Sequence, residues 1–395
     1  MNMINVRRLA VMTFLGAGML SDISAQDFSL QADTLNEARL PAQWDLQSCI
    51  DYALEQNITI RKNRVTAEST QIDVKTAKAA LFPSLSFSTS QQVVNRPYQE
   101  TSSRVSGSEI ISSNSKTSYN GNYGLNASWT IYNGSKRLKT LKQERLNNQV
   151  AELDVATSEN MIKESIAQIY IQILYAAESV RVNENTLQVS IAQRDRGQEL
   201  LNAGSIAKSD FAQLEAQVST DRYQLVTAQA TLQDYKLQLK QLLELDGENE
   251  MNVYLPKLSD ENVLAPLPAK KDVYVSALAI RPEIEASKLN VEASELGIDI
   301  AKSSYFPTIS LSAGIGTNHT SGSDFTFGEQ VKNGWNNSIG LSVSVPIFNN
   351  RQTKSAVQKA KLQRETDMLS LLDEQKALYK TIESLWLDAN SAQQR

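Results

Sequence analysis

Few side chains in this sequence could carry catalysis or hold a metal ion. Among its 395 residues there is a single histidine, His319, and a single cysteine, Cys49. With a single histidine, a zinc site or a histidine-based catalytic triad or dyad is not expected. One cysteine excludes an internal disulfide framework and any metal site built on a cysteine cluster. Glu295 and Asp299 are interpreted as a solvated helix face and not as an acid/base pair. The sequence therefore predicts no enzyme, no cofactor and no metal site.

The two rare residues have simple structural interpretations. Cys49 is expected to be a small buried residue on the first helix, and His319 is expected to be a solvated residue in a polar loop between strands. With 39 basic against 44 acidic residues, the net charge is -5. A chain without a basic footprint is not expected to bind nucleic acid.

The first residues have the pattern of an export signal. Arg7 and Arg8 precede an apolar stretch at residues 9–20, and a small residue, Ala25, stands at the expected cleavage site. The apolar stretch is too short to span a bilayer. Residues 1–25 are therefore predicted to be a signal peptide, which leaves Gln26 as the first mature residue.

The remainder of the chain contains an internal repeat, in which one sequence pattern occurs twice. Phe82-Pro83 recurs as Phe306-Pro307 at an offset of 224 residues, and a second block recurs at an offset of 216. We predict two tandem helix–strand–strand–helix repeats, at residues 26–247 and 272–395, joined by a linker at 248–271. A duplication of this kind sets the architecture of the whole fold.

Four segments alternate between apolar and small polar residues, which is typical of strands in a membrane β-barrel. These predicted strands are residues 81–95, 119–132, 305–317 and 335–348. The structural alternative is a soluble antiparallel sheet with one wet face. Six aromatic residues are expected near the membrane interfaces, and three prolines are expected where strands begin. The aromatic residues are Phe82, Trp129, Tyr132, Phe306, Trp335 and Phe348, and the prolines are Pro83, Pro307 and Pro346.

Very long helices are predicted between the strands. Residues 136–203 contain no proline and one glycine, Gly197, so they could form a single helix of about 100 Å. Residues 136–245 are predicted to form a helical hairpin, and 352–392 a further helix. Apolar residues between Phe211 and Leu242 follow a heptad, with Asp221 in one apolar slot. That period indicates left-handed coiled-coil packing.

These elements together predict a duct. An open sheet of four strands cannot stand alone in lipid, because its edges would leave backbone groups unpaired. Three copies would supply twelve strands, enough to close a barrel with polar side chains inside. The helices, too polar for lipid, would extend the same tube into water.

The sequence resembles the TolC family of outer-membrane efflux proteins. The motifs that carry the resemblance are Ala53-Leu54-Glu55-Gln56-Asn57, the two Phe-Pro steps, Arg281-Pro282-Glu283, Val345-Pro346-Ile347-Phe348 and the segment 203–210. The resemblance implies a homotrimer in the cell outer membrane, with a barrel in lipid and a helical tunnel in the periplasm. It also implies docking on a periplasmic adaptor (membrane-fusion) protein and an inner-membrane pump.

By the same resemblance, Gly204 and Asp210 lie at the periplasmic tip, where contacts gate the channel in the family. The plainer alternative for both is helix capping. The second repeat is expected to lack its tip and return helix, about 68 residues, when the offset is continued past Arg395. Two other functions stay open at this point: a periplasmic coiled-coil adaptor or scaffold, and a truncated, non-functional channel fragment. The sequence does not indicate the transported substrate.

Overall fold

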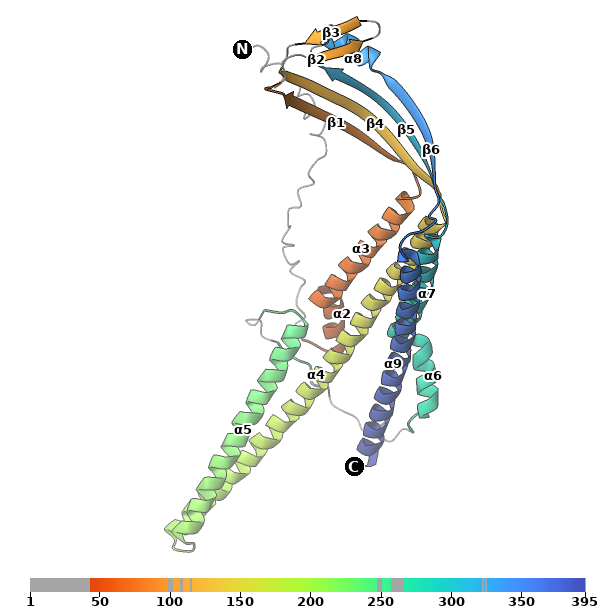
Figure 1. Ribbon diagram of the computed structural model, residues 1–395. Coiled ribbons are helices and arrows are strands. Elements are labelled where there is room, and N and C mark those ends of the chain that lie inside the picture. Colours follow the sequence, from red (N-terminus) through yellow and green to blue (C-terminus); the bar gives the residue numbers. More distant parts are fainter. Residues whose placement is uncertain are drawn as a thin grey trace.

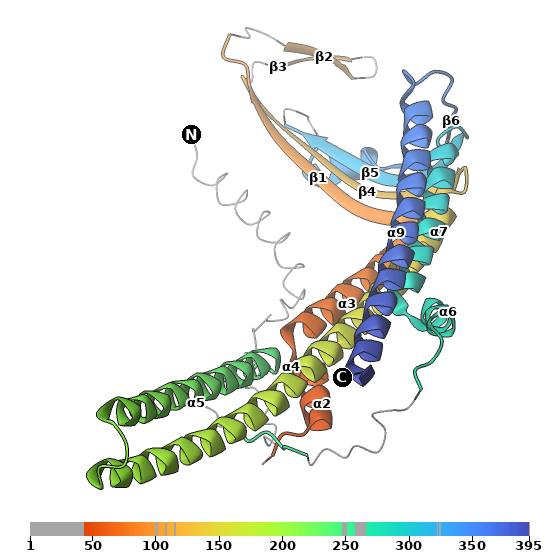
Figure 2. The same ribbon diagram turned by 90° about the horizontal axis from the view of Figure 1, so that it is seen from below.

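The molecule is elongated, with a curved sheet at one end and a helical hairpin at the other (Figure 1). The computed structural model describes residues 43–98, 116–246, 251–256, 266–321, 323 and 325–394, and the backbone of 102–106 and 109–113. The predicted signal peptide lies outside these ranges. In Figure 1, helices α3 (Ile58–Ala79), α4 (Lys136–Asn202), α7 (Pro282–Ser303) and α9 (Gln352–Gln394) lie below the sheet. Figure 2 shows that the hairpin of α4 and α5 (Lys208–Leu242) extends beyond the other helices.

The order of elements confirms the predicted duplication. The first repeat contains α2 (Leu46–Gln56), α3 (Ile58–Ala79), β1 (Ser84–Asn95), β2 (Ser102–Ser106), β3 (Glu109–Ser113), β4 (Thr117–Asn133), α4 (Lys136–Asn202) and α5 (Lys208–Leu242). The second contains α6 (Lys270–Ile280), α7 (Pro282–Ser303), β5 (Thr308–Thr320), α8 (Phe327–Asn333), β6 (Asn336–Ser344) and α9 (Gln352–Gln394). Both ends of α2 and α3 recur in α6 and α7 at the offset of 224, and the start of α4 recurs in α9 at 216.

Each repeat opens with two helices where the sequence suggested one. The breaks fall at Asn57 and Arg281, which correspond at the offset of 224 and share extended backbone angles. The Asn57 side chain accepts hydrogen bonds from the backbone N–H groups of Thr59 and Ile60, at 2.9 and 3.3 Å, and so caps α3. Arg281 precedes Pro282, whose ring disfavours a helical conformation in the residue before it.

Strands from both repeats form one antiparallel sheet in the order β1-β4-β5-β6. Strand β4 pairs with β5, so the sheet crosses the boundary between the repeats. The register aligns apolar with apolar residues: Phe87, Leu125 and Ile315 are direct neighbours. One irregularity lies between Thr130 and Tyr132, where Ile131 is the extra residue of a bulge. The predicted alternation of faces holds up to that point.

The two connections between the paired strands, β1 to β4 and β5 to β6, contain regular structure. In the first repeat the connection forms a second antiparallel hairpin, β2–β3, and in the second it forms the short helix α8. Thr326 caps α8: its hydroxyl accepts from the backbone N–H of Glu329, while its own N–H donates to the Glu329 carboxylate. This reciprocal pair is a capping box and explains why so short a segment is helical.

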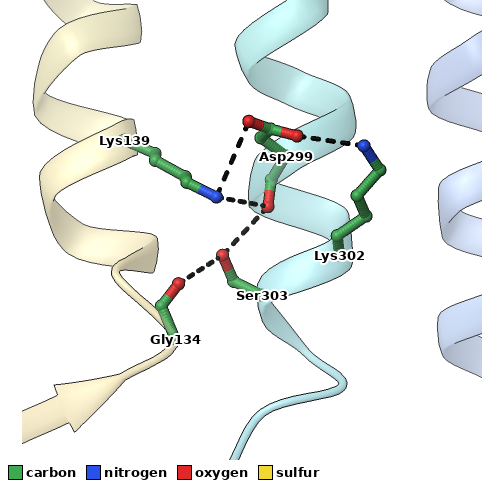
Figure 3. A network of polar contacts seen from close by, with 5 residues as sticks. All are labelled: Gly134, Lys139, Asp299, Lys302 and Ser303. Carbon is green, nitrogen blue, oxygen red and sulfur yellow. Dashed lines mark hydrogen bonds and ion pairs between the residues drawn. The ribbon is translucent and has the colours of Figure 1, made fainter.

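A polar network joins the two repeats where the strands meet the helices (Figure 3). The Ser303 hydroxyl, at the end of α7, bonds the carbonyl oxygens of Gly134 and Asp299, both at 2.9 Å. Lys139 of α4 lies 3.7 Å from one Asp299 carboxylate oxygen, and Lys302 lies 3.1 Å from the other. The hydrogen bond from Lys302 is the main cause that holds the pKa of Asp299 below its ordinary value. Here, Asp299 is an ion-paired bridge and not merely solvated.

The main core lies midway along the molecule, where α2, α4, α5 and a short extended segment meet. Ile166, Ile173, Leu239 and Cys49 are fully buried there. Trp44 forms a parallel bridge with Val253, next to the residues that link the repeats. Cys49 is thus a buried core residue, as expected.

Replacing Gly134 is expected to destabilise the junction. Gly134 has a φ of 67°, and a Cβ there would lie 2.7 Å from the Ser303 carbonyl oxygen. We expect Gly134→Ala to cost about 1–3 kcal/mol of folding free energy, measured by thermal loss of the circular dichroism signal in detergent. Gly328→Ala is the control, because nothing lies within 4 Å of its Cβ position. Equal melting of both variants would contradict the prediction.

Cys49 supplies a second test. Burial, followed by the nearby charge of Asp45, raises the pKa of its thiol from 9.0 to about 12. The stability that this shift contributes is fully present below pH 9 and is lost as the pH rises toward 12. At pH 8 we expect iodoacetamide to leave the folded chain unmodified and to alkylate the urea-unfolded chain. Alkylation of the folded chain at a similar rate would contradict the buried position.

Candidate channel wall and hairpin tip

One face of the sheet is apolar and uncovered. Leu85 and Phe87 of β1 are 70% and 68% exposed, and Ile339 and Leu341 of β6 are 84% and 65% exposed. The register places all four on the face that also carries Leu125 and Ile315. A continuous apolar sheet face open to the surroundings is unusual in a water-soluble monomer and marks a surface for lipid or protein.

The opposite face is polar and built from small residues. Successive rows across the sheet run Ser86, Asn126, Gly314, Ser338 and Ser84, Ser128, Ser312, Gly340. Hydroxyl groups bond between strands: the Ser84 and Ser128 oxygens lie 2.9 Å apart, and the Ser312 hydroxyl donates to the Gly340 carbonyl at 3.2 Å. Alternation of this kind lets one face meet lipid while the other meets water.

The predicted aromatic residues gather mainly at one end of the sheet. Five of them flank the strand ends that join the helices, and all five are at least 38% exposed: Phe82, Trp129, Tyr132, Phe306 and Phe348. Trp335 alone precedes β6 at the far end. The structure adds exposed aromatic residues near that end, Tyr119, Phe325 and Phe327, which the sequence analysis did not single out.

Pro83 and Pro307 come directly before β1 and β5, as expected. Pro346 differs, because it follows β6, which ends at Ser344. Strand β6 runs toward the helices, whereas β1 and β5 run away from them, so all three prolines lie at the helix-joined end. A proline cannot donate a ladder hydrogen bond, and this explains why β6 is shorter than the predicted 335–348.

His319 does not lie in a loop. It is the penultimate residue of β5 and pairs with Gly121 of β4. Its ring stacks on Tyr123, with centroids 5.9 Å apart, and meets the Phe327 ring edge-on at 5.1 Å. The Nδ1 atom is buried and has no hydrogen-bond partner among the residues that the structure describes. His319 is therefore part of an aromatic contact that holds α8 against the sheet.

The far helical end is a tight turn between α4 and α5. Gly204 has a φ of 71°, and the backbone N–H of Ser205 donates to the Leu200 carbonyl at 2.8 Å, which closes the end of α4. The Asp210 carboxylate accepts from the Ala207 N–H at 3.4 Å and from the Ser209 hydroxyl at 3.3 Å. Capping thus accounts for the local positions of both residues.

A shallow groove beside this turn is lined by Arg196 and Leu200 of α4, Asp210 and Leu214 of α5, and Ile206 of the turn itself, among others. Its floor contains Gly197, where a Cβ would lie 2.4 Å from the Leu214 side chain. The absence of a side chain at Gly197 allows α4 and α5 to approach closely near the tip.

The heptad predicted in α5 packs against α4. Val218 and Leu239 are buried, and so is Asp221, which is 3% exposed. Its carboxylate accepts hydrogen bonds from the Ser190 hydroxyl of α4 and from the Gln217 amide. A buried polar layer in a coiled coil fixes which residues lie opposite one another.

Sites of other kinds are not found in the described residues. Within those ranges, no group of three or more His, Cys, Asp or Glu side chains could hold a metal ion. No helix among them has both the length and the apolar character to cross a membrane. Glu295 forms an ion pair with Arg364 of α9, at 2.6 Å, and so links two helices.

An uncovered apolar sheet, a polar opposite face and a long helical hairpin together define the fold of an outer-membrane channel subunit. A model of the family described as "Outer membrane efflux protein" matches residues 49–244 and 273–395. The chain belongs to this family, and the resemblance to the TolC family is confirmed. It is a family of outer-membrane channels and not of enzymes, with the helices on the periplasmic side.

Known proteins resemble the chain over most of its length. The outer membrane efflux protein BepC of Brucella suis is 26% identical over 236 residues, which cover 59% of this chain and 48% of BepC. A crystal structure of CusC has a TM-score of 0.72 at 20% identity, covering 90% of this chain and 79% of CusC. The CmeC channel of Campylobacter jejuni has a TM-score of 0.69 at 17% identity, covering 88% and 73%.

These structures share the fold, mainly helical with four antiparallel strands in two repeats, and confirm the predicted fold class. Several curated relatives are longer proteins: the matched regions span between 48% and 66% of their lengths.

The buried polar layer of the hairpin is open to test. Ser190→Ala leaves the buried Asp221 carboxylate with one fewer donor and should destabilise the chain by about 1–3 kcal/mol. Ser190→Ala combined with Asp221→Leu should restore or exceed the original stability, because the whole polar pair is replaced by apolar packing. Thermal unfolding measures both. Ser219→Ala is the control, since its hydroxyl bonds only its own helix; equal losses in the single and double variants would refute the pairing.

Proposed function

We propose that three copies of this chain form a passive exit duct of a multicomponent export system, crossing the outer membrane and extending into the periplasm. The observation that carries the proposal is the sheet: four strands with two open edges, one lipid-compatible face and one polar face. Three such sheets joined edge to edge form a closed barrel of twelve strands.

Closure follows from the open edges of the sheet. In the described residues, neither β1 nor β6 pairs on its outer side. A bilayer offers no water to satisfy those backbone groups, so each edge requires another strand. The outer edge of β6 in one copy and that of β1 in the next are the available partners. With the apolar face outward, the row containing Asn126 and Ser338 faces the bore.

The helices support the same ring. Helix α3 carries exposed Ile58, Val65 and Ile72 at seven-residue intervals, and α9 carries exposed Leu362 and Leu369 at the same interval. A seven-residue apolar repeat is the seam of a coiled coil. Since α3 leads into β1 and α9 follows β6, closing the barrel brings α3 and α9 of neighbouring copies side by side. These seams then cover each other.

Relatives suggest the class of system. Their names describe toxin and drug export in Aggregatibacter actinomycetemcomitans and a cation efflux system in Escherichia coli O157:H7. We propose that this chain likewise works with a periplasmic adaptor and an inner-membrane pump, the source of energy and selection. The hairpin tip around Gly204 and Asp210 is the proposed docking and gating end.

The same proposal gives the aromatic residues and the two repeats their roles in the channel. Phe82, Trp129, Tyr132, Phe306 and Phe348 form the periplasmic girdle, and Trp335 belongs to the outer one. Residues 26–247 and 272–395 form two similar segments of the tube wall, and residues 248–271 link them. A water-soluble adaptor or scaffold is disfavoured by the uncovered apolar face of the sheet.

The proposal predicts a trimer that conducts ions. The purified chain in detergent should have about three times the mass of one copy by light scattering, and should produce stable conductance steps in planar lipid bilayers. A monomer, or a trimer that never conducts, would contradict the duct.

A charge in the α3 seam should break the trimer. Val65→Glu buries a carboxylate between copies and should weaken each contact by roughly 2–4 kcal/mol. Thr66→Glu, on the adjacent exposed position, adds the same charge outside the seam and is the matched control. Light scattering at a series of concentrations measures the effect. If both variants dissociate equally, the seam is not an interface.

A further inference from the structure

The membrane strands are free of charge. Acidic and basic residues make up 21% of the chain, yet β1, β4, β5 and β6 contain no Asp, Glu, Lys or Arg. The apolar face requires this, because charges facing lipid are costly. The polar face does not require it, since a water-filled bore readily accepts charged side chains. The neutrality of the polar face is therefore a property of the bore itself.

The polar face changes in character along the strands. Its half nearest the helices carries mainly hydroxyl groups and glycine, as in the row Ser84, Ser128, Ser312 and Gly340, with Asn126 in the next row. Its far half carries amide side chains, which belong to Gln92, Asn120, Asn122, Asn318 and Asn336. In three copies these amides form a collar at the outer mouth.

Small residues on this face are set by close packing between strands. A Cβ at Gly314 would lie 3.0 Å from the Ser338 hydroxyl oxygen, and one at Gly340 would lie 3.0 Å from that of Ser312. A side chain at either position would therefore press on a hydroxyl group of the neighbouring strand. Most of the amide side chains lie farther toward the outer mouth.

Hydroxyl and amide groups both donate and accept hydrogen bonds. They can therefore solvate anions and cations alike. Rings of fixed charge, in contrast, concentrate one sign of ion in a pore and exclude the other.

We infer that the barrel is an electrically neutral bore that passes cargo of either charge sign. This inference rests on the proposed duct and adds to it the class of cargo that the barrel admits: hydrated solutes irrespective of charge. Any preference for one sign must then arise in the helical part or in the partner proteins.

The test places a single charge in the bore of the full-length chain. Ser312→Cys introduces one reactive thiol per copy on the polar face, while the natural Cys49 is buried. Planar bilayers with a KCl gradient report the ion preference as a reversal potential. Methanethiosulfonate reagents then attach a positive, a negative or an uncharged group to the same position in an open channel.

A neutral bore should respond symmetrically. We expect the cationic and anionic reagents to shift the K⁺/Cl⁻ permeability ratio by similar factors in opposite directions, roughly threefold or more. The uncharged reagent should leave the ratio unchanged. Ala313→Cys, on the apolar face of the same strand, is the matched control and should not respond. The unsubstituted chain should not respond either.

The contrary outcomes are distinct. A large shift with one sign and little with the other would reveal existing charge in the bore and overturn the inference alone. The absence of any response at Ser312→Cys would show that the polar face does not line the pore, and would also overturn it. A chain that never conducts would refute the duct itself.

Discussion

The structure depends on one constraint: backbone N–H and C=O groups in lipid must find partners within the protein. Four antiparallel strands satisfy it everywhere except at the outer edges of β1 and β6. Because these two edges need strands of other copies as partners, the need for backbone hydrogen bonds becomes a need for an oligomer. The same constraint explains why the duplication was useful, since β4 and β5 pair across the repeat boundary and leave two open edges where separate repeats would leave four.

The change from sheet to helix is a second constraint, because the backbone must change direction where a strand ends and a helix begins. It is met at a single level of the molecule by Gly134 with its positive φ, by the Ser303 hydroxyl and by prolines beside the strands. The ion pairs of Asp299 and Glu295 hold α7 between α4 and α9 at and below this level. The junction therefore belongs to both repeats at once, which ties the direction of the tunnel helices to that of the barrel strands.

Periodic features were predictable from the sequence, and features set by single contacts were not. Alternation predicted the faces of the strands, and the heptad predicted the packing of α5 on α4, because both patterns reflect which side of an element is buried. The break at Asn57 depends on a helix cap, and the break at Arg281 depends on the proline that follows it. Of the two, the Arg281-Pro282 pair was the feature of the sequence that could have predicted a break. Helix α8 depends on Thr326 and Glu329, and His319 was misplaced because its environment is formed by Phe327 of α8. At the tip, the turn around Gly204 was predictable, whereas the groove beside Gly197 arises from the packing of two helices.

Charge is divided within this chain by the medium that each part meets. The helices carry dense ionic side chains and even bury Asp221 where Ser190 and Gln217 can satisfy it. The four long strands carry none on either face. Contact with lipid explains the absence of charged side chains on the apolar face only, so their absence from the polar face needs a separate cause. At Gly314 and Gly340 the neighbouring strand leaves little room for a side chain, and hydroxyl groups can bond across the sheet without counter-ions. If three copies close the barrel as proposed, its wall holds water without fixed charge, and the bore adds no electrostatic barrier to cargo of either sign.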